Sequence, residues 1–348
     1  YGRHRGPGPH MLVGSHVESQ NHAGWLDGAL GVVAGVALAR AGLPVDVVGF
    51  ADEEGHFQGG FLGSRSLTGS LDDEELDALS DRTTGTPLRE ALRAAGLAGR
   101  RRVQLEDGRH RGYMELHIEQ GTRLESAGLR LGVVTGIVAI WQWRLQVQGR
   151  QDHAGGRAMA ERQDAGLTAV RLLAALDAEF PRVVGPHTTW TTGRIALDPG
   201  APSIVPGAAD ILFQFRDLDP DTLQRLTATL ERVVGESNRR ERTVTTATQL
   251  TRPEPALCDA QLMAALAQAA EAHAPGAWQR MPSGAGHDAQ LLARRMPAAM
   301  LFVPSMGGIS HHWTEDTHPD DLVLGAQVLA SAVARALNPD PNINNFKE

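Results

Sequence analysis

Cysteine is almost absent from this chain, because Cys258 is the only one among 348 residues. A single cysteine excludes an internal disulfide framework and any zinc site built from several thiolates. It also favours a reducing, cytoplasmic setting. Long apolar runs are missing as well, since no stretch reaches the ~18 apolar residues that a membrane-spanning helix needs. We therefore expect no insertion into a membrane.

Basic residues are outnumbered, with 33 Lys and Arg against 41 Asp and Glu and a formal net charge of -8. This balance argues against nucleic acid or an anionic membrane surface as a partner. Hydrophobic residues make up 42% of the chain and charged residues 21%, which is typical of a folded globular protein. At this length, two domains are a better expectation than one.

The first part of the chain alternates short apolar runs with helical patterns. We predict buried strands over 11–15, 45–50 and 113–118, and helices over 27–40 and 119–127. Strand, loop and helix in this order predict an α/β domain with a mostly parallel sheet. Because the first strand begins so close to residue 1, we expect that residues upstream of the sequence are missing.

The pattern changes after Gly132. A stretch over 133–149 alternates apolar and polar residues, which is typical of a half-exposed strand. It is followed by a helix over 162–178, strands over 188–197 and 210–216, a helix over 221–236 and a strand over 243–250. This β-α-β-β-α-β order is that of the ferredoxin-like split unit. We therefore expect an α+β domain over 138–251, inserted into an α/β domain of residues 1–137 and 252–338, with a loose tail at 339–348.

Histidine and carboxylate side chains cluster at or shortly after the ends of the predicted strands, and Asp27 opens the first long helix. The members of this set are His16, Asp27, Glu53, Glu54, His117, His311 and His312. In an open α/β sheet the ligand site lies outside the carboxyl ends of the strands, so we expect the set to converge. Neutral imidazoles and carboxylates are typical zinc ligands. A carboxylate such as Asp27 can bridge two ions.

Each of these residues has a plain structural interpretation when it is taken alone. Asp27 is by itself most typical of a helix N-cap, and Glu53-Glu54 of a solvated acidic pair. His16 alone could be an ordinary strand-end histidine, and His117 a core histidine with satisfied hydrogen bonds. The joint occurrence of these residues at strand ends favours the functional interpretation.

Seven motifs are distributed along nearly the whole chain. They are GSHVESQNHAGWLDGALGV (14–32), ADEEGHFQGGFLGSRSLTG (51–69), ELHIEQG (115–121), GVVTGI (132–137), HAGGRAM followed by RQDA (153–165), SGAGHDA (283–289) and GISHHWTEDT (308–317). In this order they resemble the N-carbamoyl-L-amino-acid hydrolase and allantoate amidohydrolase family. Its members are dinuclear metal amidases related to aminoacylases and zinc aminopeptidases. The resemblance implies a zinc-aminopeptidase-like catalytic domain with an inserted ferredoxin-like lid and dimerisation domain.

Residue by residue, the resemblance implies five metal ligands, which are His16, Asp27, Glu54, His117 and His311. Asp27 would bridge two divalent ions, with zinc expected before manganese, cobalt or nickel. Glu53 would be the general base, and His153 would stabilise an oxyanion, often across the dimer. The implied substrate contacts are Gln120, His153, Ser203, Arg216 and His287. Arg216 would hold a substrate carboxylate, for which a planar guanidinium is suited.

The implied reaction is hydrolysis of a linear C–N bond in an N-carbamoyl or N-acyl amino acid. A metal-bridged hydroxide would attack the ureido or amide carbonyl, and Glu53 would carry the proton to the leaving nitrogen. Two alternatives stay open. One is an aminoacylase or dipeptidase that uses the same site on another acyl group, and the other is a dimer that binds its ligand without catalysis.

Three places depart from the family's motifs. Glu18 stands where the family has an aspartate that orients the metal histidine, so the surroundings of His16 must differ. Ser203 stands where the family has an asparagine, thirteen residues before Arg216. Residues 155–159 read GGRAM where threonines and a proline are usual. The choice of metal and of substrate is therefore open at this point.

Overall fold

The computed structural model describes residues 1–338, which form two compact units. One contains residues 1–137 and resumes at Ala256, and the other is Val138–Pro255. The second unit therefore ends at Pro255 and not at 251 as expected. Trp141 explains the difference: its indole N–H donates to the carbonyl of Pro253 at 2.9 Å, and the guanidinium of Arg252 lies 4.6 Å from its ring. The tail predicted at 339–348 lies outside the described residues.

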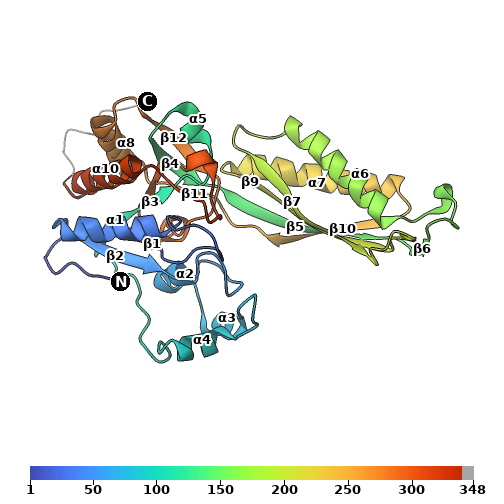
Figure 1. Ribbon diagram of the computed structural model, residues 1–348, viewed down its shortest axis with the longest axis horizontal. Coiled ribbons are helices and arrows are strands. Elements are labelled where there is room, and N and C mark those ends of the chain that lie inside the picture. Colours follow the sequence, from blue (N-terminus) through green and yellow to red (C-terminus); the bar gives the residue numbers. More distant parts are fainter. Residues whose placement is uncertain (339–348) are drawn as a thin grey trace. The chain divides into compact units, whose positions relative to one another are not determined.

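The first unit is built on a seven-stranded sheet with helices on both faces (Figure 1). Its strands run in the order β11-β4-β13-β3-β1-β2, with β12 beside β4. Their bounds are β1 (His10–His16), β2 (Val45–Phe50), β3 (His110–Ile118), β4 (Leu131–Ile137), β11 (Ala256–Leu257), β12 (Trp278–Ser283) and β13 (Ala298–Val303). β2, β1, β3 and β13 are parallel neighbours, whereas β4 is antiparallel to β13. The parallel strands bring their carboxyl ends to one edge.

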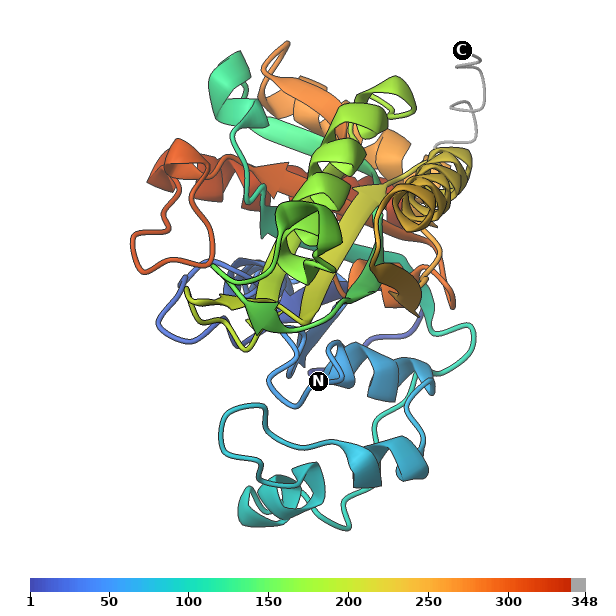
Figure 2. The ribbon, with the colours of Figure 1, turned by 90° about the vertical axis from the view of Figure 1, so that its right-hand side faces the viewer.

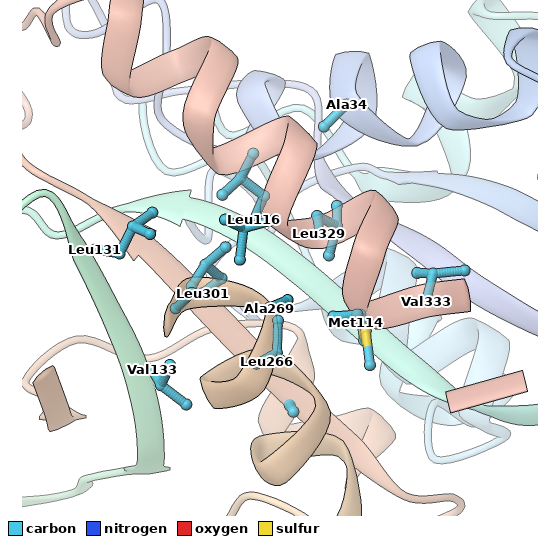
Figure 3. Packing of buried hydrophobic residues seen from close by; sticks show 14 of the residues in the cluster. Ala34, Met114, Leu116, Leu131, Val133, Leu266, Ala269, Leu301, Leu329 and Val333 are labelled. Carbon is cyan, nitrogen blue, oxygen red and sulfur yellow. The ribbon is translucent and has the colours of Figure 1, made fainter. Parts of the chain in front are cut away.

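The longer helices of this unit pack on one face of the sheet. These are α1 (Ala29–Arg40), α8 (Ala260–His273) and α10 (Pro319–Leu337). The shorter ones are α2 (Leu62–Thr68), α3 (Asp73–Ala78), α4 (Leu88–Ala94), α5 (Arg123–Ala127) and α9 (Ala289–Leu292). Figure 3 shows Leu266 and Leu329 from the helices meeting Leu116 and Leu301 from the strands. Burial of these apolar side chains stabilises the layers.

A close contact sets where α1 begins. A Cβ atom at Gly31 would lie only 2.7 Å from the carbonyl oxygen of Leu116 and 2.8 Å from Cβ of Ser15. Only glycine lets the first turn of the helix approach β1 and β3 this closely. The loop before α1 is thereby held against the carboxyl ends of both strands.

The second unit is a four-stranded antiparallel sheet with α6 and α7 side by side on one face (Figures 1 and 2). Its strands run β10-β5-β9-β7. The elements are β5 (Ala139–Gln148), β6 (Asp152–His153), α6 (Ala165–Glu179), β7 (Thr189–Asp198), β8 (Ile204–Val205), β9 (Ala208–Asp217), α7 (Pro220–Arg240) and β10 (Val244–Thr251). The four sheet strands and two helices follow the β-α-β-β-α-β order expected from the sequence. The strand expected over 133–149 is in fact two strands, β4 and β5, which belong to different units.

Among residues 1–338, no helix has both the length and the apolar character that crossing a bilayer requires. A cytoplasmic location stays a prediction.

A buried carboxylate joins residues near the start of three strands in the first unit. Asp46 accepts hydrogen bonds from the Tyr1 hydroxyl at 2.7 Å, the His4 amide at 2.8 Å, the Arg109 guanidinium at 2.6 and 2.9 Å and the His110 ring at 2.9 Å. Burial acts to raise the pKa of Asp46, but these hydrogen bonds, led by that of Arg109, hold it well below its usual range.

We expect Asp46→Ala to lower the free energy of unfolding by about 3 kcal/mol, because it removes the carboxylate from a buried ion pair. Urea denaturation at pH 7 measures this. Since the folded pKa lies below the unfolded value of ~4, the stabilisation is present above pH ~4 and is lost as the pH falls further. Asp73→Ala removes an exposed partner of Arg89 and is the control, expected to change far less. Equal effects in both variants would contradict the prediction.

Candidate functional site

Asp27 lies among three imidazoles at the carboxyl ends of the parallel strands. Its Oδ1 is 3.4 Å from Nε2 of His16 and 3.2 Å from Nε2 of His117, and its Oδ2 is 3.1 Å from Nε2 of His311. Oε1 of Glu54 is 3.2 Å from the same nitrogen of His311. The five predicted ligands thus form two groups that share Asp27, one with His16 and His117 and one with Glu54 and His311.

The backbone before α1 turns Asp27 toward these imidazoles. The helix begins at Ala29 with Gly28 as its N-cap, and no side chain caps it. The plain interpretation of Asp27 as an N-cap is therefore wrong. Gly28 has a φ of +70°, and a Cβ atom there would lie 2.3 Å from Nδ1 of His16. Its backbone N–H donates to Nε2 of His117 at 3.2 Å. Glycine is needed here both for conformation and for space.

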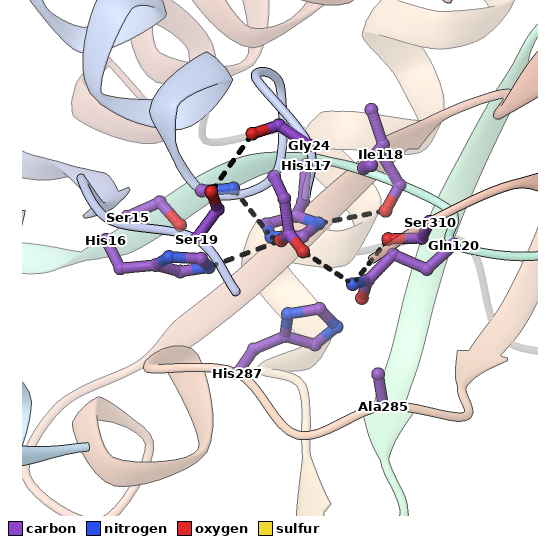
Figure 4. A network of polar contacts seen from close by, with 12 residues as sticks. Ser15, His16, Ser19, Gly24, His117, Ile118, Gln120, Ala285, His287 and Ser310 are labelled. Carbon is purple, nitrogen blue, oxygen red and sulfur yellow. Dashed lines mark hydrogen bonds and ion pairs between the residues drawn. The ribbon is translucent and has the colours of Figure 1, made fainter. Parts of the chain in front are cut away.

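Backbone carbonyls fix the two buried histidines in the tautomer that a metal needs. Nδ1 of His16 lies 2.6 Å from the carbonyl of Glu18, and Nδ1 of His117 lies 2.9 Å from the carbonyl of Ile118. A carbonyl only accepts, so Nδ1 carries the hydrogen in both rings and Nε2 faces Asp27. Figure 4 shows the rings of His16 and His117 facing the same group. Such outer contacts set the orientation of ligating imidazoles.

The contacts of Glu18 show what its extra length does where the family's motif has an aspartate. Its carboxylate does not orient His16 closely, because Oε1 lies 4.0 Å from Nδ1 of that ring. Instead Oε1 accepts the backbone N–H of Glu53 at 2.5 Å. The longer side chain therefore supports the loop of the acidic pair, while the Glu18 carbonyl orients the histidine.

Negative charge dominates this centre. Burial and the charge of Asp288 are the main causes that hold the pKa of Glu53 well above its usual range, and burial with the charge of Glu115 raises the pKa of Asp288 to about 8. The pKa values of His16, His117 and His311 are raised as well, which for an imidazole favours the charged form. Burial acts to lower the pKa of His16, but the Asp27 hydrogen bond and nearby carboxylates raise it to about 11. The carboxylates around His16 therefore favour positive charge at this centre.

A third group of possible ligands, Glu115, His117 and His287, supports this centre from behind. The Glu115 carboxylate already accepts three neutral donors, which are the Ser15 hydroxyl at 2.6 Å, the Tyr113 hydroxyl at 3.0 Å and the Ala289 amide at 3.2 Å. His287 is 1% exposed, and its ring centroid lies 4.6 Å from that of His117. Its Nε2 is 2.8 Å from Oγ of Ser283. His287 is thus buried against His117, and the substrate contact expected of it stays a prediction.

Glu315, which no sequence pattern predicted as part of the site, joins the two loops that carry Asp27 and His311. Its Oε1 accepts the backbone N–H groups of Leu26 at 3.2 Å and Asp27 at 3.0 Å, and its Oε2 accepts the Ser310 hydroxyl at 2.9 Å. The residue is 2% exposed. The one feature of the sequence that pointed to Glu315 was its place within the motif GISHHWTEDT. Its burial could not be predicted, because burial of an acidic residue next to an exposed loop depends on the tertiary fold.

Gln120, the predicted substrate contact, lies beside the predicted ligands Asp27 and His311. Its amide nitrogen is 3.1 Å from Oδ2 of Asp27, 3.1 Å from Oγ of Ser310 and 3.3 Å from Nε2 of His311. Gln120 and His311 both have a positive φ, of 58° and 55°. Non-glycine residues rarely adopt this conformation, and it concentrates at functional sites.

The second unit carries the other expected residues. His153 in β6 pairs with Ile204, and the amide of Ala154 donates to the Ser203 carbonyl at 3.0 Å, so His153 and Ser203 lie together. Nδ1 of His153 accepts the backbone N–H groups of Gly155 at 3.1 Å and Gly156 at 3.0 Å. The ring hydrogen of neutral His153 is therefore on Nε2, which makes that nitrogen a donor.

Arg216 does not join this pair within one chain. It lies near one end of β9, opposite Ile140 in β5. His153 follows β5 and Ser203 precedes β9 at the other end, where Ala208 pairs with Gln148. Eight residue steps along the strand, about 26 Å, separate Ala208 from Arg216. Arg216 and the pair of His153 and Ser203 therefore lie toward opposite ends of β9.

Known proteins resemble this chain along almost all of its length. The model of Peptidase family M20/M25/M40 matches residues 17–335. An N-carbamoyl-L-amino acid amidohydrolase from Geobacillus stearothermophilus is 35% identical over 348 residues, covering 95% of this chain and 83% of that protein. An allantoate amidohydrolase from Escherichia coli (strain K12) is 32% identical, with 95% and 82% covered. The crystal structure of an amidase of the hydantoinase/carbamoylase family from Burkholderia phymatum has a TM-score of 0.88 at 45% identity, covering 97% of this chain and 83% of that chain. The resemblance carried by the seven motifs is confirmed.

We expect Gly28→Ala to lower the affinity for zinc at least about tenfold, because the added Cβ displaces the ring of His16. Isothermal titration of chelator-treated protein with zinc measures this. Gly42→Ala is the matched control, since Gly42 also has a positive φ, of 84°, but no atom within 4 Å of a Cβ. It should carry only the conformational cost of about 1 kcal/mol. Equal zinc affinity in both variants would show that Gly28 does not place His16.

Proposed function

The chain belongs to peptidase family M20/M25/M40, and we propose that it is a metal-dependent amidohydrolase that cleaves the ureido C–N bond of an N-carbamoyl amino acid. The observation that carries this proposal is the position of Asp27 between two groups of ligands, next to the acidic pair Glu53-Glu54. The names of the Geobacillus stearothermophilus and Escherichia coli relatives support a linear ureido substrate over a peptide.

The five ligands suit two divalent cations, with zinc first among them. Imidazole Nε2 atoms and carboxylate oxygens are the donors that zinc prefers, and Asp27 offers one oxygen to each group. Bound cations would polarise the scissile carbonyl and make an attacking water more acidic.

Glu53 is suited to move the proton. The Glu18 carboxylate holds its backbone N–H at 2.5 Å, and burial with neighbouring negative charge raises its pKa. A carboxylate with a raised pKa is a stronger base, so it can take a proton from water and then give it to the leaving nitrogen. His153 presents Nε2–H as a donor for the oxygen that becomes negative during attack. Arg216 would bind the carboxylate of the amino acid.

The second unit would act as a lid and as the interface of a homodimer. Since Arg216 and His153 stand at opposite ends of β9, a complete site needs His153 from a second copy if both residues contact one substrate. β7 supports the placement of that interface in this unit. Within residues 1–338 it pairs only with β9, and nine of its ten residues are exposed. A long free edge strand is a ready surface for a second chain.

Replacement of the proposed base tests the function directly. We expect the wild-type enzyme to release ammonia from N-carbamoyl amino acids, and Glu53→Gln to reduce turnover about 10³-fold. Both proteins should bind close to two metal ions per chain by elemental analysis, because Glu53 is not a proposed ligand. Retained activity would contradict the base assignment. Metal binding without ammonia release from any carbamoyl substrate would favour the aminoacylase or dipeptidase alternative, and absence of all hydrolysis the binding dimer.

Mixing two inactive variants tests the shared site. Arg216→Ala and His153→Ala should each be nearly inactive alone. After unfolding and joint refolding in equal amounts, activity should recover to about a quarter of the wild-type value, because about half of the dimers are mixed and each has one intact site. If His153 acted within its own chain, every site would carry one substitution and the mixture would stay inactive.

A further inference from the structure

We propose that Glu315, acting through Ser310, fixes the side-chain amide of Gln120 so that its carbonyl oxygen faces the substrate, and that this selects a ureido NH₂ over a methyl group. The proposal rests on the proposed function and deepens it, because it assigns the preference for a carbamoyl over an acyl group to a buried chain of hydrogen bonds. Gln120 would touch the substrate, and the other two residues would position it.

The chain of hydrogen bonds starts at Glu315. All of the partners of its carboxylate are donors, so the carboxylate acts only as an acceptor. Two backbone N–H groups, those of Leu26 and Asp27, donate to Oε1 at 3.2 and 3.0 Å. The Ser310 hydroxyl donates to Oε2 at 2.9 Å. A Cβ atom at Gly24 would lie 2.5 Å from Oε1, so the packing leaves the carboxylate little freedom to turn.

The hydrogen bond from Ser310 to Glu315 determines how Ser310 can interact with Gln120. A hydroxyl has one hydrogen, and in Ser310 it is directed to Glu315. Oγ of Ser310 must therefore accept from its other neighbour, the Gln120 side chain at 3.1 Å. Oδ2 of Asp27, 3.1 Å from the same end of that amide, also only accepts. Two acceptors thus require the NH₂ group at this end of Gln120.

The amide orientation of Gln120 is consequently determined by its network, although oxygen and nitrogen are otherwise hard to tell apart in such groups. Figure 4 shows the nitrogen joined to its neighbours and the oxygen pointing away from them. The backbone of Gln120 is held as well, since its N–H donates to Oγ of Ser305 at 3.0 Å despite the φ of 58°. The carbonyl oxygen is left as an acceptor beside the proposed ligands.

An acceptor at this position separates two substrates of nearly equal shape. An N-carbamoyl group ends in NH₂, which donates, whereas an N-acetyl group ends in CH₃, which cannot. A site built to form a hydrogen bond disfavours the analogue that leaves its polar group unpaired. The ratio of kcat/KM for the N-carbamoyl and N-acetyl derivatives of one amino acid therefore reports whether the carbonyl oxygen of Gln120 faces the substrate.

We expect Ser310→Ala to reduce this ratio about tenfold, because the amide of Gln120 then loses the acceptor that fixes it. Glu315→Gln should reduce it as well, since the new amide can donate to Ser310 and turn its hydrogen toward Gln120. Ser310→Thr keeps the hydroxyl and should keep the ratio. Ser126→Ala, an exposed serine on α5, is the matched control for loss of a hydroxyl.

A second measurement does not depend on turnover. In the Glu53→Gln background, the ratio of dissociation constants for the same two compounds, measured by calorimetry, should fall in parallel when Ser310→Ala is added. Metal content per chain checks that the site is intact. If the wild type releases ammonia but Ser310→Ala leaves both ratios unchanged, the inference is overturned and the proposed function stands. If no carbamoyl substrate is cleaved, both fail.

Discussion

The site depends on one buried carboxylate that three imidazoles share. Asp27 can face His16, His117 and His311 at once only because the backbone before α1 is held in an unusual position. Gly28 supplies the positive φ, Gly31 lets the helix approach the strands, and Glu315 holds the amide of Asp27 itself. The parallel strands bring the histidines to one edge of the sheet, and these local contacts direct the aspartate toward them.

Much of this arrangement could be predicted, because its causes are local in the sequence. Short apolar runs that end in histidine or glutamate identify both the strands and the edge at which they converge. The break at Val138 could not be predicted, since the alternation over 133–149 continues through it and the change of unit depends on packing of Trp141 against residues 252 and 253. The burial of His287 and Glu315 also comes from the tertiary fold, and neither motif reveals it.

Glu18 illustrates why a motif predicts where a side chain lies better than it predicts the hydrogen bonds around it. One extra methylene moves the carboxylate from the histidine to the backbone of Glu53, yet the ring of His16 keeps its orientation because a carbonyl two residues away takes over. Hydrogen bonds to an imidazole N–H need only an acceptor in the right direction. Substitutions around a metal site can therefore preserve the ligand while they change which loop it stabilises.

The hydrogen-bond partners of each buried carboxylate indicate whether it is available to bind a metal ion or is already used to hold the fold together. This distinction needs no reference to a family. Glu115 and Glu315 accept hydroxyl and backbone N–H donors, which cannot leave without exposing an unpaired polar group. Their oxygens are thus occupied by the fold itself. Asp27 instead faces imidazole Nε2 atoms on both of its oxygens, and a lone pair on Nε2 can bind a cation. Buried carboxylates of the same charge thus differ in whether their surroundings leave them open to a bound cation.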